Sequence, residues 1–149
     1  LLKDEAKGNW REPARRWALL AWGFLGAGVV IGGYWAYKVR GWGGYWGWDP
    51  VENSSLVPWL LAGAFVHILH VAKRRPAALS VLHLSVIFTF ALVIYGTFLT
   101  RSGILGDFSV HSFSGTSIGM TLAVVNAIVL IDGLALLTKK ADNLTQGKL

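Results

Sequence analysis

The sequence has no cysteine and few charged residues. Asp, Glu, Lys and Arg make up 15% of its 149 residues, whereas a soluble domain carries about 25%. The missing cysteine excludes disulfides and thiolate metal ligands within these residues. The shortage of charge, together with 54% hydrophobic residues, argues against a water-soluble enzyme, and the length allows one domain at most.

The chain also lacks an initiator methionine and a basic leader before a cleavable apolar stretch, because it opens with Leu-Leu-Lys-Asp. No signal peptide is therefore expected. The chain is expected to be a central portion of a larger protein.

Long uncharged runs fill most of the sequence, and each is close to the roughly 20 residues that a helix needs to cross a bilayer. No alternating strand pattern competes with them, and lipid permits only helices or closed barrels. The predicted fold is therefore all-α, a polytopic membrane bundle of about four helices. The predicted spans are residues 17–37, 57–72, 78–99 and 118–138.

All but three of the 14 basic residues fall on one predicted side of the membrane, the exceptions being Lys38, Arg40 and Arg101. The positive-inside rule makes this side cytoplasmic. The predicted cytoplasmic segments are 1–16, 73–77 and 139–149, and the external loops are 38–56 and 100–117. The net charge of +6 is thus interpreted as an orientation signal, and no nucleic-acid binding is expected.

The first external loop concentrates aromatic residues among glycines. Within seven residues it contains Trp42, Tyr45, Trp46 and Trp48. If the segment were helical, three of these rings and Asp49 would share one face, and such a surface would suit a flat ligand. The alternative is an interfacial aromatic belt, which would also include Trp35 and Trp59.

The residues after these tryptophans predict a helix start. Asp49 suits the N-cap, Pro50 the first helical position and Glu52 the third, which together make a capping box. This structural role of Asp49 is compatible with a role in binding. Pro58 would either kink the following helix or mark its entry into the membrane.

Three motifs resemble a known family. The string WGGYWGWDPVENSSLVPWL from Trp42 to Leu60 resembles the tryptophan-rich "WWD" signature of proteins that handle haem during cytochrome c maturation. Its Asp-Pro-Val-Glu-Asn continuation, with GTFLTRSGIL from Gly96 and SVHSF from Ser109, resembles the CcmF/NrfE-type haem lyase subunits. The resemblance covers most of residues 30–115 and implies a bacterial inner-membrane protein whose haem-handling loops face the periplasm.

This resemblance implies two haem sites. At the outer site, substrate haem would lie on Trp42, Tyr45, Trp46, Trp48 and Asp49. His111 would ligate its iron there, since imidazole is a common axial ligand, and Arg101 would pair with a propionate. Within the bilayer, His67 would ligate a b-type haem. Each site lacks its second histidine in this chain.

Each of these residues also has a simpler interpretation. His111 could be a solvated loop residue, Arg101 an interfacial anchor, and His67 a neutral histidine bonded to a neighbouring helix. His70 and His83 match no family ligand and are interpreted as structural. Asp132 is expected to pair with His83 or to reach toward Lys139.

The implied function is attachment of haem to apocytochrome c as part of a haem lyase complex. The implied partners are haem, a holo haem chaperone of the CcmE type, apocytochrome c with thiol-handling proteins of the CcmH/CcmI type, and membrane lipid, with quinol as a candidate electron donor. Two alternatives remain open: a haem exporter or non-catalytic haem-binding module, and a purely structural bundle.

Overall fold

The computed structural model describes residues 10–41, 44–72, 74–75, 78–109, 111–113 and 118–145, without the side chains of residue 40 and residues 140–145. These residues form four helices, α1 (Arg11–Arg40), α2 (Pro50–Val71), α3 (Ala78–Arg101) and α4 (Ile118–Thr145). Each contains a stretch that is long and apolar enough to cross a membrane. The predicted all-α fold with four candidate spans is confirmed.

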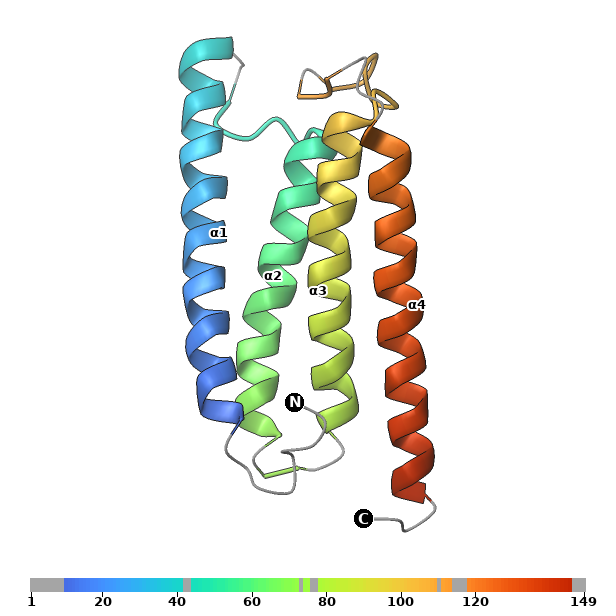
Figure 1. Cartoon of the computed structure of the whole chain (residues 1–149). Helices are drawn as coiled ribbons and strands as arrows, with labels where there is room; N and C mark the ends of the chain where they lie inside the picture. Colours follow the sequence, from blue (N-terminus) through green and yellow to red (C-terminus); the bar gives the residue numbers. More distant parts are fainter. Residues whose placement is uncertain are drawn as a thin grey trace.

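The helices stand in a row in which each packs against the next along the chain (Figure 1). We call the end that carries residues 44–49, 102–109 and 111–113 the loop end, and the opposite end the turn end. A small buried core joins α2 and α3 near the turn end, built from Phe65, Leu69, Ala72 and Leu82. Among the described residues, helices that are not consecutive make no packing contacts.

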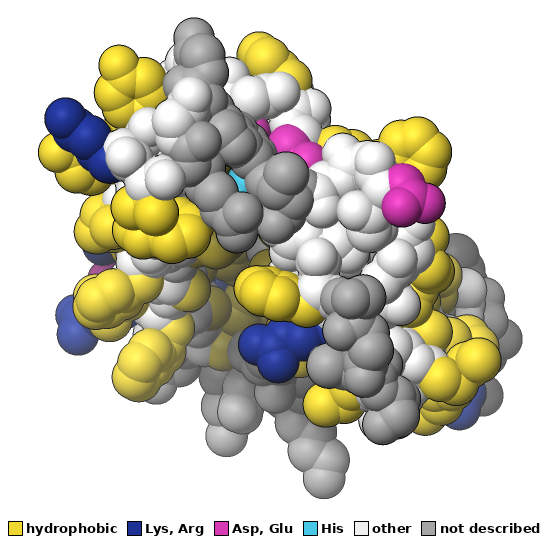
Figure 2. All heavy atoms as spheres, turned by 90° about the horizontal axis from the view of Figure 1, so that it is seen from above, with side chains coloured by type: hydrophobic (Ala, Val, Ile, Leu, Met, Phe, Trp, Pro, Cys, Tyr) yellow, Lys and Arg dark blue, Asp and Glu magenta, His cyan; other side chains and the backbone are white. Residues whose placement is uncertain are grey.

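The outer faces of the row are apolar. Large hydrophobic side chains are exposed on every helix, among them Phe24, Phe90 and Ile131. Seen from the loop end, hydrophobic side chains stand around the periphery with few charged ones between them (Figure 2). Because water-exposed apolar surfaces of this extent mark interaction sites, these faces belong against lipid or other protein segments.

The helix ends follow local sequence signals. The predicted capping box is confirmed, because Asp49 accepts from the backbone of Val51 and Glu52 while Glu52 accepts from the backbone of Asp49. Residues 50–56, expected in the first external loop, therefore form the first two turns of α2. At the other side of this loop α1 ends at Arg40 and is followed by Gly41, whose left-handed φ of 64° is the usual conformation of a glycine after a helix.

Pro58 lies inside α2 and is fully buried. Proline has no N–H, so it leaves the carbonyl of Ser54, four residues earlier, without its helical hydrogen bond. Gly96 of α3 lies against this carbonyl, and a Cβ added there would stand 3.2 Å from the Ser54 oxygen and 3.0 Å from its Oγ. The absence of a side chain at Gly96 thus permits close approach of α2 and α3.

His83 lies on the side of α3 that faces α1. Its Nδ1 bonds to the Leu79 carbonyl at 2.6 Å, and its ring centroid is 6.3 Å from that of Trp10. Asp132 is exposed on α4. These surroundings support a structural role for His83 beside α1 rather than α4.

Candidate functional site

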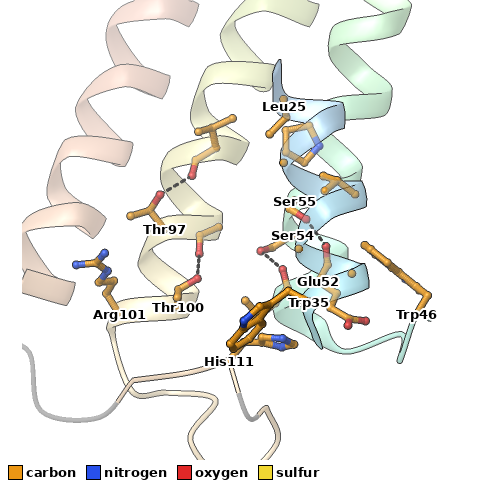
Figure 3. A pocket seen from close by; sticks show the side chains of 18 residues that line it. Leu25, Trp35, Trp46, Glu52, Ser54, Ser55, Thr97, Thr100, Arg101 and His111 are labelled. Atoms are coloured by element: carbon orange, nitrogen blue, oxygen red, sulfur yellow. Dashed lines mark hydrogen bonds between the residues drawn. The ribbon is translucent and has the colours of Figure 1, made fainter. Parts of the chain in front are cut away.

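A cavity of about 460 Å³ opens at the loop end between α1, α2 and α3 (Figure 3). Its volume lies within the range of about 300–1,000 Å³ that is usual for small-molecule sites. Aromatic, apolar and hydroxyl side chains line it, with one histidine, one arginine and one glutamate. The principal lining residues are Leu25 and Trp35 of α1, Glu52, Ser54, Ser55 and Pro58 of α2, Val93, Thr97, Thr100 and Arg101 of α3, and Trp46 and His111 of the loops.

The four hydroxyl groups in the cavity wall donate to carbonyls of their own helices. Ser54 and Ser55 donate to residues three positions earlier at 2.7 Å. Thr97 and Thr100 donate to residues four positions earlier at 3.0 and 2.8 Å. Because their protons are already bonded, these residues present their carbon atoms and lone pairs without an unsatisfied donor. The wall is therefore compatible with a largely apolar ligand.

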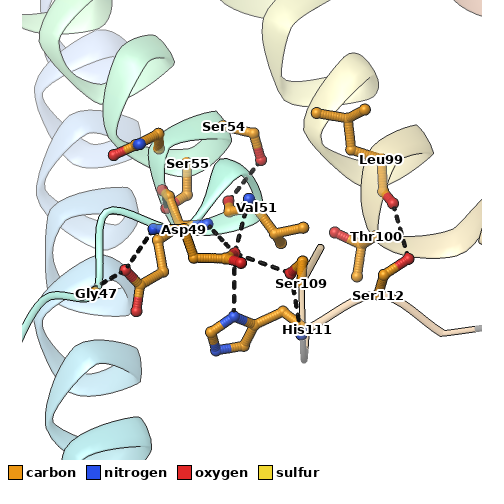
Figure 4. Close-up of polar contacts among 12 residues, drawn as sticks. Gly47, Asp49, Val51, Ser54, Ser55, Leu99, Thr100, Ser109, His111 and Ser112 are labelled. Carbon is orange, nitrogen blue, oxygen red and sulfur yellow. Dashed lines mark hydrogen bonds and ion pairs between the residues drawn. The ribbon is translucent and has the colours of Figure 1, made fainter. Parts of the chain in front are cut away.

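His111 belongs to the segment that joins α3 to α4. Phe113 donates its backbone N–H to the Thr100 carbonyl at 2.8 Å, and His111 donates its own backbone N–H to Ser109 Oγ at 3.1 Å. The imidazole Nδ1 lies 3.3 Å from Asp49 Oδ2 (Figure 4). The structure thus joins the two predicted external loops in one site, although Asp49 and His111 are 62 residues apart.

The tryptophan-rich segment, which lies between α1 and α2, is not helical over residues 44–49. The arrangement considered above, in which three aromatic rings and Asp49 share one face of a helix, is therefore wrong. Trp46 lines the cavity, and its indole N–H donates to Asn53 Oδ1 at 3.3 Å. Tyr45 lies against α1, where its hydroxyl donates to the Val30 carbonyl. Trp48 is 73% exposed. Only Trp46 of these three rings lines the cavity, and Trp42 lies outside the described residues.

Glu52 holds the tryptophan-rich segment in place. Its buried carboxylate accepts from the backbone of Gly47 at 2.9 Å and of Asp49 at 3.4 Å. Trp48, between them, has a φ of 55°, a left-handed conformation that costs a non-glycine residue about 1–2 kcal/mol. Asn53 Nδ2 donates to its carbonyl at 3.1 Å. These bonds offset that cost and fix the position of Trp46.

Most of the cavity residues were not assigned to the site from sequence, and two of these are Trp35 and Glu52. Trp35 was grouped with an aromatic belt, yet it lines the cavity, as its place among the small residues Gly32, Gly33 and Ala36 could have indicated. Glu52 was assigned only to the capping box. Its place at the third helical position, in the first turn of α2, directs it back over the loop, so the same motif contained the signal. Arg101, which was assigned, also lines the cavity.

His67 lies apart from this cavity. It is exposed on α2, about 180° around the helix from the buried stripe of Phe65 and Leu69 when each residue turns by about 100°. Since α2 begins at Pro50, His67 lies roughly 10 Å beyond the midpoint of the helix toward the turn end. It is therefore farther from the midpoint of α2 than from the midpoint of the predicted span 57–72. His70 is also exposed.

The side chains that could bind a metal favour a ligand whose metal ion is already coordinated by the ligand itself. The described residues contain no group of three His, Asp or Glu side chains that could hold a bare metal ion. A single imidazole in an aromatic and apolar cavity instead suits an iron already held by a planar macrocycle. Arg101 supplies a positive charge that suits carboxylates on its edge. The residues present therefore fit haem.

Comparison with protein families identifies the group to which the chain belongs. The family described as cytochrome C assembly protein matches residues 3–105. The chain belongs to this family. The match includes α1, α2, α3 and the tryptophan-rich segment, which together form most of the cavity wall, and ends before His111.

Within the family the chain is similar to the CcmF/NrfE branch, as its motifs indicated. It is 47% identical over 114 residues to the cytochrome c-type biogenesis protein CcmF of Pseudomonas aeruginosa, covering 76% of this chain and 17% of that protein. It is 41% identical to CcmF of Haemophilus influenzae, covering 97% of this chain and 22% of that protein.

The probable cytochrome c-type biogenesis protein NrfE of Escherichia coli is 42% identical to the chain, covering 91% of this chain and 24% of that protein. The chain thus spans about a fifth of the length of the curated relatives it matches. No solved structure matches it.

Proposed function

We propose that this chain forms part of the outer haem-handling site of a CcmF-type protein and takes part in attaching haem to apocytochrome c. The observation that carries the proposal is the loop-end cavity, in which an imidazole joins tryptophan rings and an arginine. His111 would ligate the iron of the substrate haem. Trp46 and Trp35 would contact its ring, with Trp48 at the exposed rim.

The reaction requires binding and orientation more than added functional groups. A cysteine thiol of the apocytochrome adds across a haem vinyl group: the S–H bond breaks, a C–S bond forms on one vinyl carbon, and hydrogen ends on the other. Haem supplies the reactive vinyl groups. The residues of this chain would hold the ring against the cavity wall, with Arg101 fixing a propionate and so the direction in which the vinyl groups point.

The loop end would face the periplasm, because basic residues gather toward the turn end, in the first turns of α1 and after α2. A CcmE-type chaperone would then deliver haem and CcmH/CcmI-type proteins would present reduced apocytochrome at the same face. Under this proposal the protein would lie in a bacterial inner membrane, and the catalytic step would take place in a haem lyase complex.

Loss of the His111 imidazole tests the outer site. In the purified full-length protein we expect His111→Ala to weaken haem binding at the loop end by more than the roughly 10- to 100-fold that loss of an outer-sphere partner costs. Haem titration followed by the Soret band measures this, with His70→Ala as the matched control. Wild-type affinity in His111→Ala would contradict the proposal. Haem bound without any thioether product from purified components would favour the exporter.

His67 would ligate a separate b-type haem that supplies electrons to the outer site, with quinol as a candidate donor. Its exposure on the side of α2 away from the core supports a partner ligand on a segment beyond these four helices. We expect His67→Ala to remove or shift the b-type Soret band while the protein is still expressed and loop-end haem still binds. The optical spectrum of the purified variant measures this, and an unchanged b-type band would refute the role of His67.

A further inference from the structure

One carboxylate oxygen links the start of α2 to the histidine segment. Asp49 Oδ2 accepts from the backbone N–H groups of Val51 at 2.9 Å and Glu52 at 3.2 Å. The same oxygen accepts from Ser109 Oγ at 2.9 Å and lies 3.3 Å from His111 Nδ1 (Figure 4). One atom thus joins two loops that are separated in the sequence by a complete helix pair.

The contact determines which nitrogen of His111 can bind a metal. An ionised carboxylate only accepts hydrogen bonds, so Nδ1 donates to Asp49. In a neutral imidazole the other nitrogen then carries the lone pair that can coordinate a metal. Figure 4 shows this nitrogen, Nε2, on the side of the ring away from Asp49. His111 lines the cavity, and a metal ligated by its imidazole while the contact to Asp49 is kept would be bound at Nε2.

Asp49 itself is placed behind the cavity wall. Its side chain is 8% exposed, compared with 22% for that of His111, and it is not among the residues that line the cavity. Its engaged oxygen already has backbone and side-chain donors. The family resemblance implied that Asp49 contacts haem directly. These observations argue against such a contact.

We propose that Asp49 is a positioning residue that acts through His111. By accepting from Nδ1 it fixes the tautomer and the ring orientation, and it makes Nε2 a stronger electron donor to iron. Because the same oxygen caps α2, the imidazole is held in register with the helix that carries Glu52 and Ser54 of the cavity wall. This inference rests on the proposed function, with His111 as the ligand of loop-end haem.

Replacing the histidine by free ligands isolates the contact. In the full-length protein, His111→Gly leaves space for an added imidazole, whose N–H can donate to Asp49 while its other nitrogen binds iron. 1-Methylimidazole has no N–H to donate. With Asp49 present, we expect imidazole to ligate loop-end haem about 10- to 100-fold more tightly than 1-methylimidazole, as measured by titration of the Soret band.

The second variant, Asp49→Ser, removes the partner while keeping a good N-cap, because serine caps helices about as well as aspartate. In His111→Gly/Asp49→Ser the preference for imidazole over 1-methylimidazole should disappear. Hydrogen exchange at the backbone of Val51 and Glu52 checks that α2 still begins at Pro50. An equal preference with and without Asp49 would overturn the proposal.

A measurement with the native histidine covers the case in which the glycine variant does not recover haem. With His111 present, Asp49→Ser should weaken loop-end haem binding about 10- to 100-fold. It should also make the midpoint potential more positive, because a weaker imidazole donor stabilises ferric iron less. Unchanged affinity and potential would overturn the positioning role.

These outcomes separate the two proposals. A loop-end haem signal that does not depend on His111 contradicts the proposed function. A signal that is lost in His111→Ala but is insensitive to Asp49→Ser contradicts only the positioning role of Asp49.

Discussion

Glu52→Ala is expected to release the tryptophan-rich segment and to abolish most haem binding at the loop end, although Glu52 is not an iron ligand. The substitution removes the acceptor for the N–H groups of Gly47 and Asp49. Hydrogen bonds to a charged group contribute about 1.5–3 kcal/mol each. Exchange of these two amides should therefore become about 10- to 100-fold faster, as measured by hydrogen–deuterium exchange of the full-length protein.

Glu52→Gln is the matched control. The glutamine side chain has the same length, and its carbonyl can accept the same two bonds without the charge. It should exchange much more slowly than Glu52→Ala and retain most of the haem affinity. If Glu52→Ala left both the exchange rates and the affinity unchanged, the segment would not be held by this carboxylate.

The loss of haem affinity follows from the way Trp46 is positioned. The strained left-handed Trp48 and the bond from Trp46 to Asn53 keep the Trp46 ring at the cavity only while the backbone of 44–49 stays fixed. Without Glu52, Trp48 can relax to an ordinary conformation. The aromatic wall would then be lost even though every tryptophan is still present.

Local signals in the sequence were sufficient to predict the helix that carries this site. Asp49, Pro50 and Glu52 lie within one turn, so their capping interactions depend on nearest neighbours alone, and the structure contains them. Apolar length likewise predicted four helices. The predicted span begins at residue 57, seven residues after the helix start, because the polar stretch Glu52–Ser55 is helical but not apolar.

The arrangement of the aromatic residues could not be predicted in the same way. Their directions depend on contacts across the fold, such as Tyr45 with Val30 of α1. A left-handed Trp48 also contradicts the local preference of its residue type. The bond between Asp49 and His111 spans 62 residues, and sequence spacing contains no information about it. The resemblance implied that both residues contact haem at one site, whereas in the structure His111 lines the cavity and Asp49 does not.

The joint between α1 and α2 is another feature that only the structure reveals. Trp22 of α1 stacks on Trp59 of α2 with centroids 5.4 Å apart and planes 6° apart. The Trp59 indole donates to the Trp22 carbonyl at 3.2 Å. Each tryptophan lies against a glycine of the opposite helix, Trp59 on Gly26 and Trp22 on Gly63. Trp59 thus packs between helices rather than in an aromatic belt.

Gly26→Ala adds only one methyl group, yet it is expected to destabilise the protein strongly. The new Cβ would stand 2.5 Å from Trp59 Nε1, so the indole must move and lose its stacking and its hydrogen bond. Overpacking of this kind costs about 1–3 kcal/mol. Thermal unfolding of the purified full-length protein should show a lower midpoint than for the wild type.

Gly23→Ala, about one turn earlier on α1, is the matched control, because a Cβ there would meet nothing within 4 Å. The same substitution should leave stability unchanged or raise it by up to about 1 kcal/mol through the better helix propensity of alanine. Equal tolerance of both variants would show that the Trp22–Trp59 joint is absent from the complete protein.

The effect of Gly26→Ala should extend to haem binding. Trp35 lies nine residues further along α1, about 14 Å toward the loop end, and among the described helices α1 packs only on α2. A shift at the joint therefore moves the α1 wall of the cavity away from His111 and Trp46. Loop-end haem affinity should fall in Gly26→Ala and remain at the wild-type value in Gly23→Ala. A loss of affinity in both variants would show that haem binding depends on α1 in some way other than through the Trp22–Trp59 joint.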